Sequence, residues 1–109
     1  MEYLQGTNSA DFFRQEKISD RERSAVANKL LQLLSELKAQ RISHGDMKST
    51  NFILVDGDPY LVDLDAMRLH KSEEKFNRYH KKDIARFRRN WSDDERTMDL
   101  FDSLYEQYG

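Results

Sequence analysis

The sequence predicts a mainly helical domain that carries one small β-hairpin. Three observations lead to this prediction: a long stripe of leucines at helical spacing, two β-rich runs around a tight turn, and two further helical patterns in the C-terminal third. At 109 residues the chain has the length of a single domain. Its composition, 38% hydrophobic and 35% charged with one Pro and four Gly, excludes collagen-like and low-complexity chains.

Two helices are expected in the first forty residues. A short helix is predicted over residues 9–17, where Phe12 and Phe13 supply its apolar contacts. A long core helix is predicted over residues 20–41, with Asp20 as its N-cap. The buried face of the long helix should consist of five apolar residues spaced i, i+4, i+7, i+8 and i+11: Val26, Leu30, Leu33, Leu34 and Leu37.

A β-hairpin and two more helices are expected after the long helix. The apolar run 51–55 and the run 60–62 flank Asp-Gly-Asp-Pro, so residues 52–65 are interpreted as a hairpin with a polar end. Residues 66–80 are expected to be irregular, and residues 81–109 to form C-terminal helices. The last of these helices should begin with a capping box, Ser92 to Glu95, and bury one face: Leu100, Phe101, Leu104, Tyr105 and Tyr108.

Composition also excludes several classes of function. The chain has no cysteine, which excludes a disulfide framework, thiolate zinc ligands and a thiol nucleophile. No apolar run approaches the roughly 18 residues of a membrane-spanning helix, and the first residues do not resemble a signal peptide. We therefore expect a soluble, cytoplasmic chain.

The charge is unevenly distributed although the net charge is only -2. Segment 68–89 contains nine Lys or Arg against three acidic residues, a local charge of +6. Such a basic stripe fits an anionic partner, whether a phosphate group, a nucleic acid or an acidic lipid headgroup. A solvated helix face explains it equally well at this stage.

Polar chemistry is concentrated at the two ends of the predicted hairpin. The loop His44–Asn51 contains an imidazole, a carboxylate, an ammonium group and a carboxamide, and Asp63 and Asp65 follow the second strand. A hairpin brings its ends together, so Asn51 and Asp63 should be neighbours. Their oxygen atoms suit Mg²⁺, which prefers one or two carboxylates with water or phosphate. The spacings fit neither an EF-hand loop nor a His-rich zinc site.

This arrangement resembles the catalytic centre of the protein-kinase-like fold. The motif H-R-D-x-x-x-x-N corresponds to His44-Gly45-Asp46 followed by Asn51, and D-F-G corresponds to Asp63-Leu64-Asp65. The variant HGDMKSTNFILV…LVDLDAMRLH, with the later KKDIARFRRNW, is similar to the bacterial lipopolysaccharide kinase (Kdo/WaaP) group. The resemblance covers the C-terminal lobe of that family, and residues 1–6 resemble the hinge between its two lobes.

The resemblance implies a role for each matching residue. Asp46 would be the catalytic base, and Lys48 would steady the transferring phosphoryl group of ATP. Asn51 and Asp63 would hold Mg²⁺ on the ATP phosphates. The backbone from Glu2 to Leu4 would face the adenine.

Further residues are implied to support these roles or depart from the pattern. Asp83 would be the buried carboxylate that holds the backbone of the catalytic loop, and His44 would pack and form hydrogen bonds without acting as acid or base. Gly45 replaces the Arg that reads a phosphorylated activation loop, so we expect no control of that kind. Asp65 replaces the Gly of D-F-G.

The function implied is ATP- and Mg²⁺-dependent phosphoryl transfer to a sugar hydroxyl of lipopolysaccharide or a similar glycoconjugate. Its partners would be ATP and an anionic glycolipid or other hydroxyl acceptor, which suits a place at the inner membrane. The sequence has no Gly-rich phosphate loop and no strand Lys with its partner Glu, so we expect this chain alone to be incomplete and to need an N-terminal lobe or to self-associate.

Three alternatives stay open. The chain could be a catalytically inactive kinase-like scaffold or fragment, or an atypical protein or small-molecule kinase. A basic nucleic-acid-binding module is the third, but the sequence has no recognised motif of that class, so no nucleic acid is expected as a partner.

Overall fold

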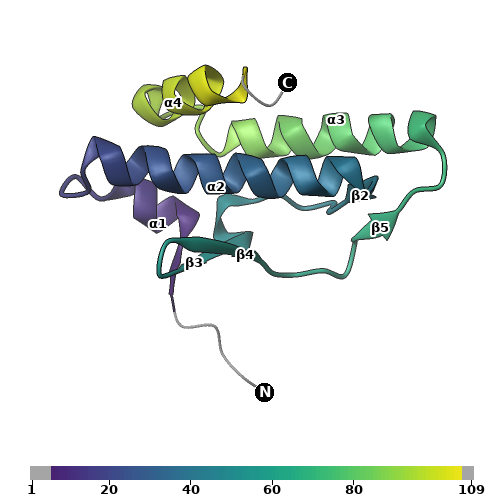
Figure 1. Cartoon of the computed structure of the whole chain (residues 1–109), viewed down its shortest axis with the longest axis horizontal. Helices are drawn as coiled ribbons and strands as arrows, with labels where there is room; N and C mark the ends of the chain where they lie inside the picture. The colour runs from purple at the N-terminus through teal and green to yellow at the C-terminus, as the bar shows by residue number, and fades with distance from the viewer. Residues whose placement is uncertain (1–5, 107–109) are drawn as a thin grey trace.

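The computed structural model describes residues 6–106 and confirms a helix-rich fold with small antiparallel sheets (Figure 1). The elements in chain order are β1 (Thr7–Asn8), α1 (Ser9–Arg14), α2 (Asp20–Ala39), β2 (Ile42–Ser43), a 3-10 turn (Ser49–Asn51), β3 (Phe52–Val55), β4 (Asp58–Leu61), β5 (Arg68–Leu69), α3 (Glu73–Arg89) and α4 (Glu95–Tyr105).

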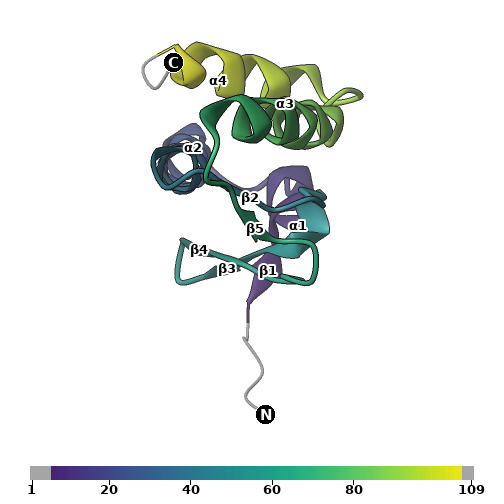
Figure 2. The same cartoon turned by 90° about the vertical axis from the view of Figure 1, so that its right-hand side faces the viewer.

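Helix α2 lies at the centre of the molecule. Helices α3 and α4 lie on one side of it, and a three-stranded antiparallel sheet with the order β1-β3-β4 lies on the other (Figures 1 and 2). A second, two-stranded ribbon pairs β2 with β5. This ribbon joins the start of the polar loop 44–51 to the segment that leads into α3. No helix within residues 6–106 is long and apolar enough to cross a membrane.

Helix α1 is shorter than the sequence predicted. It ends at Arg14 instead of continuing to residue 17. The Arg23 side chain, on α2, donates from Nη1 to the Phe13 carbonyl at 2.8 Å and from Nη2 to the Gln15 carbonyl. Arg23 thereby satisfies carbonyl groups at the end of α1, so the chain leaves the helix there and turns into α2.

Helix α2 forms where the leucine stripe predicted it. Its N-cap is Ser19, whose hydroxyl accepts from the Glu22 N–H at 3.2 Å, so the expectation of Asp20 in that role was wrong. The helix ends at Ala39, because Arg41 adopts a left-handed φ of 57°. Three of the five predicted stripe residues are buried: Val26, Leu30 and Leu34. The other two, Leu33 and Leu37, are partly buried and pack against the same core.

The predicted hairpin is present, and it gains a third strand that the sequence did not reveal. Asp56 and Gly57 both have positive φ, 52° and 81°, as a tight two-residue hairpin turn requires. Strand β1 pairs with β3, with Thr7 opposite Leu54. The backbones approach so closely that a Cβ on Gly6 would lie 2.1 Å from the Leu54 carbonyl oxygen, so only glycine fits there.

Helix α3 begins at Glu73, eight residues before the start that the sequence suggested, so the segment 66–80 is not irregular throughout. Ser72 is its N-cap and accepts from the Lys75 N–H at 3.3 Å. In the first two turns only Phe76 is a buried apolar residue. The surrounding charged side chains are exposed, which explains why no apolar period was visible there.

Helix α4 also has a different N-cap from the one expected. It begins at Glu95, and Asp94 accepts hydrogen bonds from the Thr97 N–H and hydroxyl at 3.1 and 2.6 Å. The Ser92–Glu95 capping box is therefore not formed. Phe101 is the buried centre of its inner face, while Tyr108 lies outside the described residues.

Aromatic rings join the helices into one core. Phe13, Trp91 and Phe101 lie with their ring centroids 5.3–5.5 Å apart, and Phe87 contacts Phe101 at 5.1 Å. Trp91 is only 3% exposed, so it is a core residue. Because α1, α3 and α4 meet at these rings, the core fixes the positions of the elements that contact the polar loop.

Candidate functional site

The polar loop 44–51 is anchored at its start by a carboxylate on α3. Asp83 accepts from the His44 N–H at 2.8 Å through one oxygen and from the Gly45 N–H at 3.0 Å through the other. Its side chain is 4% exposed, and a buried carboxylate requires such partners. The expectation that Asp83 holds the loop backbone is therefore confirmed by the geometry.

His44 uses both ring nitrogens for structural hydrogen bonds. The Asp46 N–H donates to Nδ1 at 3.1 Å, so Nδ1 is unprotonated. Nε2 then carries the proton and donates it to the Val62 carbonyl at 3.0 Å. The residue is completely buried, so the ring connects the loop to the end of the hairpin.

The backbone conformation at position 45 requires a glycine. Its φ of 92° is a conformation that residues with a side chain rarely adopt, and a Cβ there would lie 2.8 Å from the Ala66 Cβ. The Arg of the kinase motif could not occupy this position without moving the segment after the hairpin. The close approach holds that segment against the loop.

Asp46 and Lys48 form the partly exposed chemical face of the loop. The Lys48 Nζ lies 3.3 Å from an Asp46 carboxylate oxygen, and the side chains are 52% and 29% exposed, respectively. Asn51 Nδ2 donates to the Asp46 carbonyl at 2.8 Å and thereby fixes the backbone beneath the carboxylate. An exposed ion pair of this kind adds little stability, so its importance lies in the juxtaposition of a carboxylate and a cation.

Asn51 and Asp63 lie at the same end of the hairpin, as the sequence predicted. The Val62 N–H donates to the Asn51 carbonyl at 2.9 Å, directly before Asp63. Asp63 is exposed and has a φ of 59°, which is uncommon for a residue with a side chain. Asp56 has a similar φ because it lies in the tight β3–β4 turn, whereas Asp63 is not in such a turn. Backbone strain of this kind is often found at functional sites.

These two side chains fit a magnesium ion that keeps other ligands. The Asn51 amide nitrogen donates to the Asp46 carbonyl, and no group within residues 6–106 donates a hydrogen bond to the Asn51 Oδ1, which leaves this oxygen for a cation. Within residues 6–106 no group of three or more His, Asp or Glu side chains is placed to enclose a metal. One carboxylate and one amide oxygen, completed by phosphate oxygens and water, is the arrangement that Mg²⁺ accepts.

Two further side chains hold the loop, and sequence reasoning missed both. Asn90, at the end of α3, donates from Nδ2 to the Met47 carbonyl at 2.8 Å, and the Ser9 hydroxyl of α1 donates to the Ser49 carbonyl at 2.6 Å. Each joins residues about forty positions apart, so no local pattern could indicate it. Met47 itself is buried in the core. The loop is thus fixed from α1 and from α3 at successive positions.

His80 lies on α3, one turn before Asp83. Partial burial, and secondarily the charge of Lys38 on α2, lower its pKa from the ordinary value of 6.5, while Asp83 acts in the opposite direction. Its ring stacks on Phe76 with centroids 5.0 Å apart. His80 is therefore a packing residue that favours the neutral form.

The predicted adenine-facing residues, Glu2 and Leu4, lie outside the described residues. The other predicted site residues lie on the loop 44–51 or at the end of the hairpin that adjoins it. The helical lobe with its anchored loop, the carboxylate and lysine pair, and the hairpin-end Asn and Asp define a protein-kinase-like catalytic lobe.

Comparison with known families agrees with this class. The family model described as RIO domain matches residues 1–100, and the chain belongs to this atypical protein-kinase-like family. The match supports the kinase-like resemblance and gives no support to the narrower resemblance to lipopolysaccharide kinases. No curated protein and no solved structure matched the chain.

Proposed function

We propose that this chain supplies the catalytic-loop and metal-binding half of an ATP- and Mg²⁺-dependent phosphotransferase site. One observation carries the proposal: the loop bearing Asp46 and Lys48 is held by Asp83 at its start and by Asn51 at its end. Phosphoryl transfer depends on positioning and charge neutralisation more than on covalent chemistry by the protein. A loop fixed in this way provides that positioning.

Asp46 is assigned as the base. Its partly exposed carboxylate would accept the proton of the attacking hydroxyl group, and the adjacent Lys48 would place a positive charge beside the transferring phosphoryl group. His44 takes no part in proton transfer, because its two nitrogens are committed to the Asp46 N–H and the Val62 carbonyl.

Asn51 and Asp63 are assigned as the residues that hold Mg²⁺. Kinases of the RIO family use ATP and Mg²⁺. When bound, the ion would neutralise the charge of the ATP phosphates. The fit rests on the free Asn51 oxygen and on the exposed Asp63 carboxylate at the same hairpin end. The sugar acceptor suggested by the lipopolysaccharide-kinase resemblance has no support in the family match and forms no part of this proposal.

The metal assignment can be tested by the binding of ATP with Mn²⁺, an EPR-visible substitute for Mg²⁺, to the chain. Asp63→Asn should weaken metal-dependent ATP binding by roughly tenfold or more, because the anionic ligand is lost while the side-chain shape is kept. Asp56→Asn is the matched control: both positions are exposed Asp residues with positive φ, 59° and 52°, and Asn tolerates that conformation. The control should bind like the unmodified chain.

The base assignment needs a separate variant. Asp46→Asn should bind Mn²⁺ and ATP normally, yet abolish phosphoryl transfer in any preparation in which the unmodified sequence supports it. Equal ATP binding by the Asp63→Asn and Asp56→Asn variants would refute the metal assignment. Absence of metal-dependent binding to the unmodified chain would favour the inactive-scaffold alternative.

A further inference from the structure

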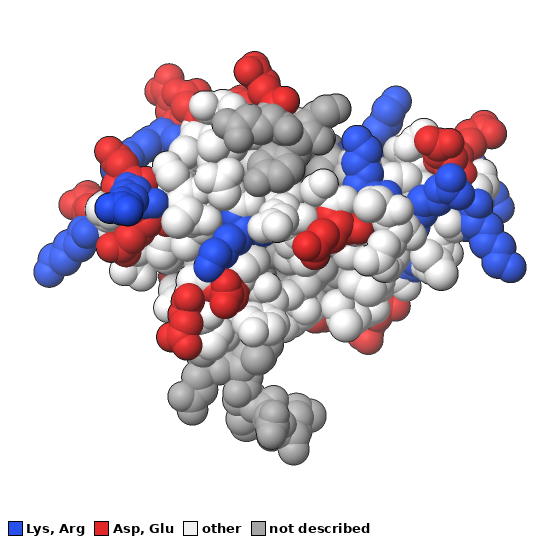
Figure 3. Space-filling view, viewed as in Figure 1, with Lys and Arg blue, Asp and Glu red and all other residues white. Residues whose placement is uncertain are grey.

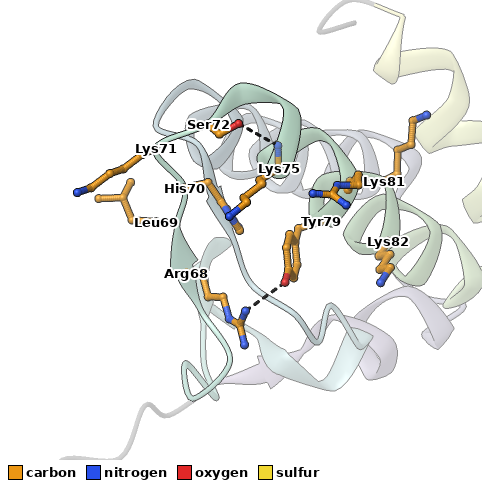
Figure 4. A pocket seen from close by; sticks show the side chains of 10 residues that line it. Arg68, Leu69, His70, Lys71, Ser72, Lys75, Tyr79, Lys81 and Lys82 are labelled. Carbon is orange, nitrogen blue, oxygen red and sulfur yellow. Dashed lines mark hydrogen bonds between the residues drawn. The ribbon is translucent and has the colours of Figure 1, made fainter.

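A basic hollow lies beside β5 and the first half of α3 (Figure 4). Its volume is about 830 Å³, within the range of about 300–1,000 Å³ typical of small-molecule sites. Figure 3 shows several Lys and Arg side chains, with acidic side chains beside them, at the right-hand end of the molecule, where Figure 1 places these elements. The hollow is lined by six cationic side chains: Arg68, Lys71, Lys75, Arg78, Lys81 and Lys82.

The positive charge of the hollow is not neutralised by the protein. Within residues 6–106 none of the six lining cations forms an ion pair, whereas other Lys and Arg residues, among them Lys29 and Arg96, are paired with carboxylates. Among the described residues no Asp or Glu lines the hollow, and Glu73 and Glu74 in the first turn of α3 are not part of its wall. Like charges that lie close together repel each other, and an anion bound between them would relieve that repulsion.

The wall of the hollow is built by tertiary contacts. Tyr79 accepts a hydrogen bond from Arg68 Nη1 at 3.1 Å, and its ring lies 5.5 Å from the Arg68 guanidinium and 5.9 Å from the Lys82 ammonium. His70 packs on Tyr79 with ring centroids 4.7 Å apart, and its Nε2 hydrogen-bonds the Ser43 hydroxyl at 2.8 Å. These contacts join β2, β5 with the residue that follows it, and α3, so tertiary packing sets the positions of the lining residues.

The hollow is also connected to the catalytic loop. Arg68 pairs with Ser43 across the β2–β5 ribbon, and Ser43 directly precedes His44, whose N–H is held by Asp83. The β2–β5 ribbon therefore contributes Arg68 to the hollow and leads directly into the catalytic loop at His44. A ligand that bound the cations would rest against the support of the loop.

We infer that this hollow binds clustered phosphate groups, either of a soluble polyphosphorylated molecule or of a phosphorylated lipid headgroup. Lys and Arg are the side chains that recognise phosphate, by charge and by charge-assisted hydrogen bonds. Stacking of nucleobases is disfavoured as the basis of recognition, since the two rings of the wall, His70 and Tyr79, pack on each other. Neither Asn51 nor Asp63, the proposed metal ligands, lines the hollow, and its occupancy does not depend on the proposed phosphotransfer.

Inositol hexakisphosphate, titrated calorimetrically into the chain in the presence of EDTA, tests this site without metal or nucleotide. Lys75, Tyr79 and Lys82 follow the helical spacing i, i+4, i+7 on the wall, so Lys75→Gln/Lys82→Gln removes two charges from one face. Binding should weaken by roughly tenfold or more, because each lysine contributes a charge-assisted contact. The matched control, Lys17→Gln/Arg21→Gln, removes two exposed charges elsewhere and should bind as the unmodified chain does.

The outcomes separate this site from the proposed catalytic function. Retained binding by Asp63→Asn together with loss in the Lys75→Gln/Lys82→Gln variant supports the phosphate site even if the magnesium assignment fails. Equal weakening by the control variant, or no binding to the unmodified chain, overturns it. Binding of the chain to vesicles with and without phosphatidylinositol bisphosphate distinguishes a lipid from a soluble source of the phosphates. Tighter binding of a single-stranded oligonucleotide than of inositol hexakisphosphate would refute a site for compact phosphate clusters.

Discussion

Replacing Asp83 by alanine removes the acceptor of two backbone N–H groups at once. The His44 residue is completely buried, so its N–H would be left without a partner, while Gly45 is exposed and its N–H can turn to water. A buried donor without a partner costs about 1–3 kcal/mol, and a hydrogen bond to a charged group contributes about 1.5–3 kcal/mol. The free energy of unfolding should therefore fall by about 3 kcal/mol, which corresponds to a decrease in Tm of roughly 12 °C for a chain of this length.

Urea denaturation of Asp83→Ala beside Asp99→Ala measures this loss. Asp99 is an exposed carboxylate on α4, and its removal should change stability by no more than about 0.5 kcal/mol. Should Asp83→Ala fail to fold, Asp83→Asn keeps the shape and loses one acceptor, so amide hydrogen exchange at His44 and Gly45 should accelerate selectively. Equal stability of the two alanine variants, or unchanged exchange in Asp83→Asn, would refute the reasoning.

Three further predictions concern packing and titration. An NMR titration should give His80 a pKa below 6.5. Because the unfolded chain binds this proton at a higher pH than the folded chain does, His80 lowers the free energy of unfolding as the pH falls below about 6.5. The His80→Gln variant should therefore lose less stability between about pH 7 and pH 5 than the unmodified chain does. Leu30 is completely buried in the core, so Leu30→Ala should cost about 3 kcal/mol in urea unfolding, and a cost near zero would contradict the assigned core. Gly45→Ala should cost roughly 1–3 kcal/mol by thermal melting, since both its φ and the close Ala66 contact exclude a side chain, and an unchanged Tm would argue against this backbone path.

The elements that the sequence predicted well carry a periodic apolar signal. The leucine stripe from Val26 to Leu37 specifies α2, because a face of that width must be buried. The start of α3 was missed because its first turns bury only Phe76 among exposed charges, although Ser72 was available as a cap. Strand β1 is two residues long, and its pairing with β3 depends on a contact between distant segments that no local pattern encodes.

The candidate site shows the same difference between features that local sequence patterns predict and contacts between distant segments. The hairpin pattern was enough to bring Asn51 and Asp63 to one end, because the two ends of a hairpin meet by local geometry. Asp83 was singled out only by the resemblance to the kinase-like family, since it lies almost forty positions from the loop that it holds. The hydrogen bonds from Asn90 and Ser9 to the loop were not predictable, since they arise only when α3 and α1 pack around the shared aromatic core. The hollow was visible in the sequence only as a run of charge, and its concave shape required the β2–β5 ribbon.

The central claim is that the end of the hairpin, beside the anchored loop, binds metal and nucleotide. Paramagnetic broadening of ¹⁵N amide signals by Mn²⁺ with ATP tests it most directly, because the effect falls steeply with distance from the ion. We expect the strongest broadening at Asn51 and Asp63, and weaker broadening at residues farther from the end of the hairpin. Broadening confined to Lys75 and the basic hollow, or no selective broadening, would contradict it.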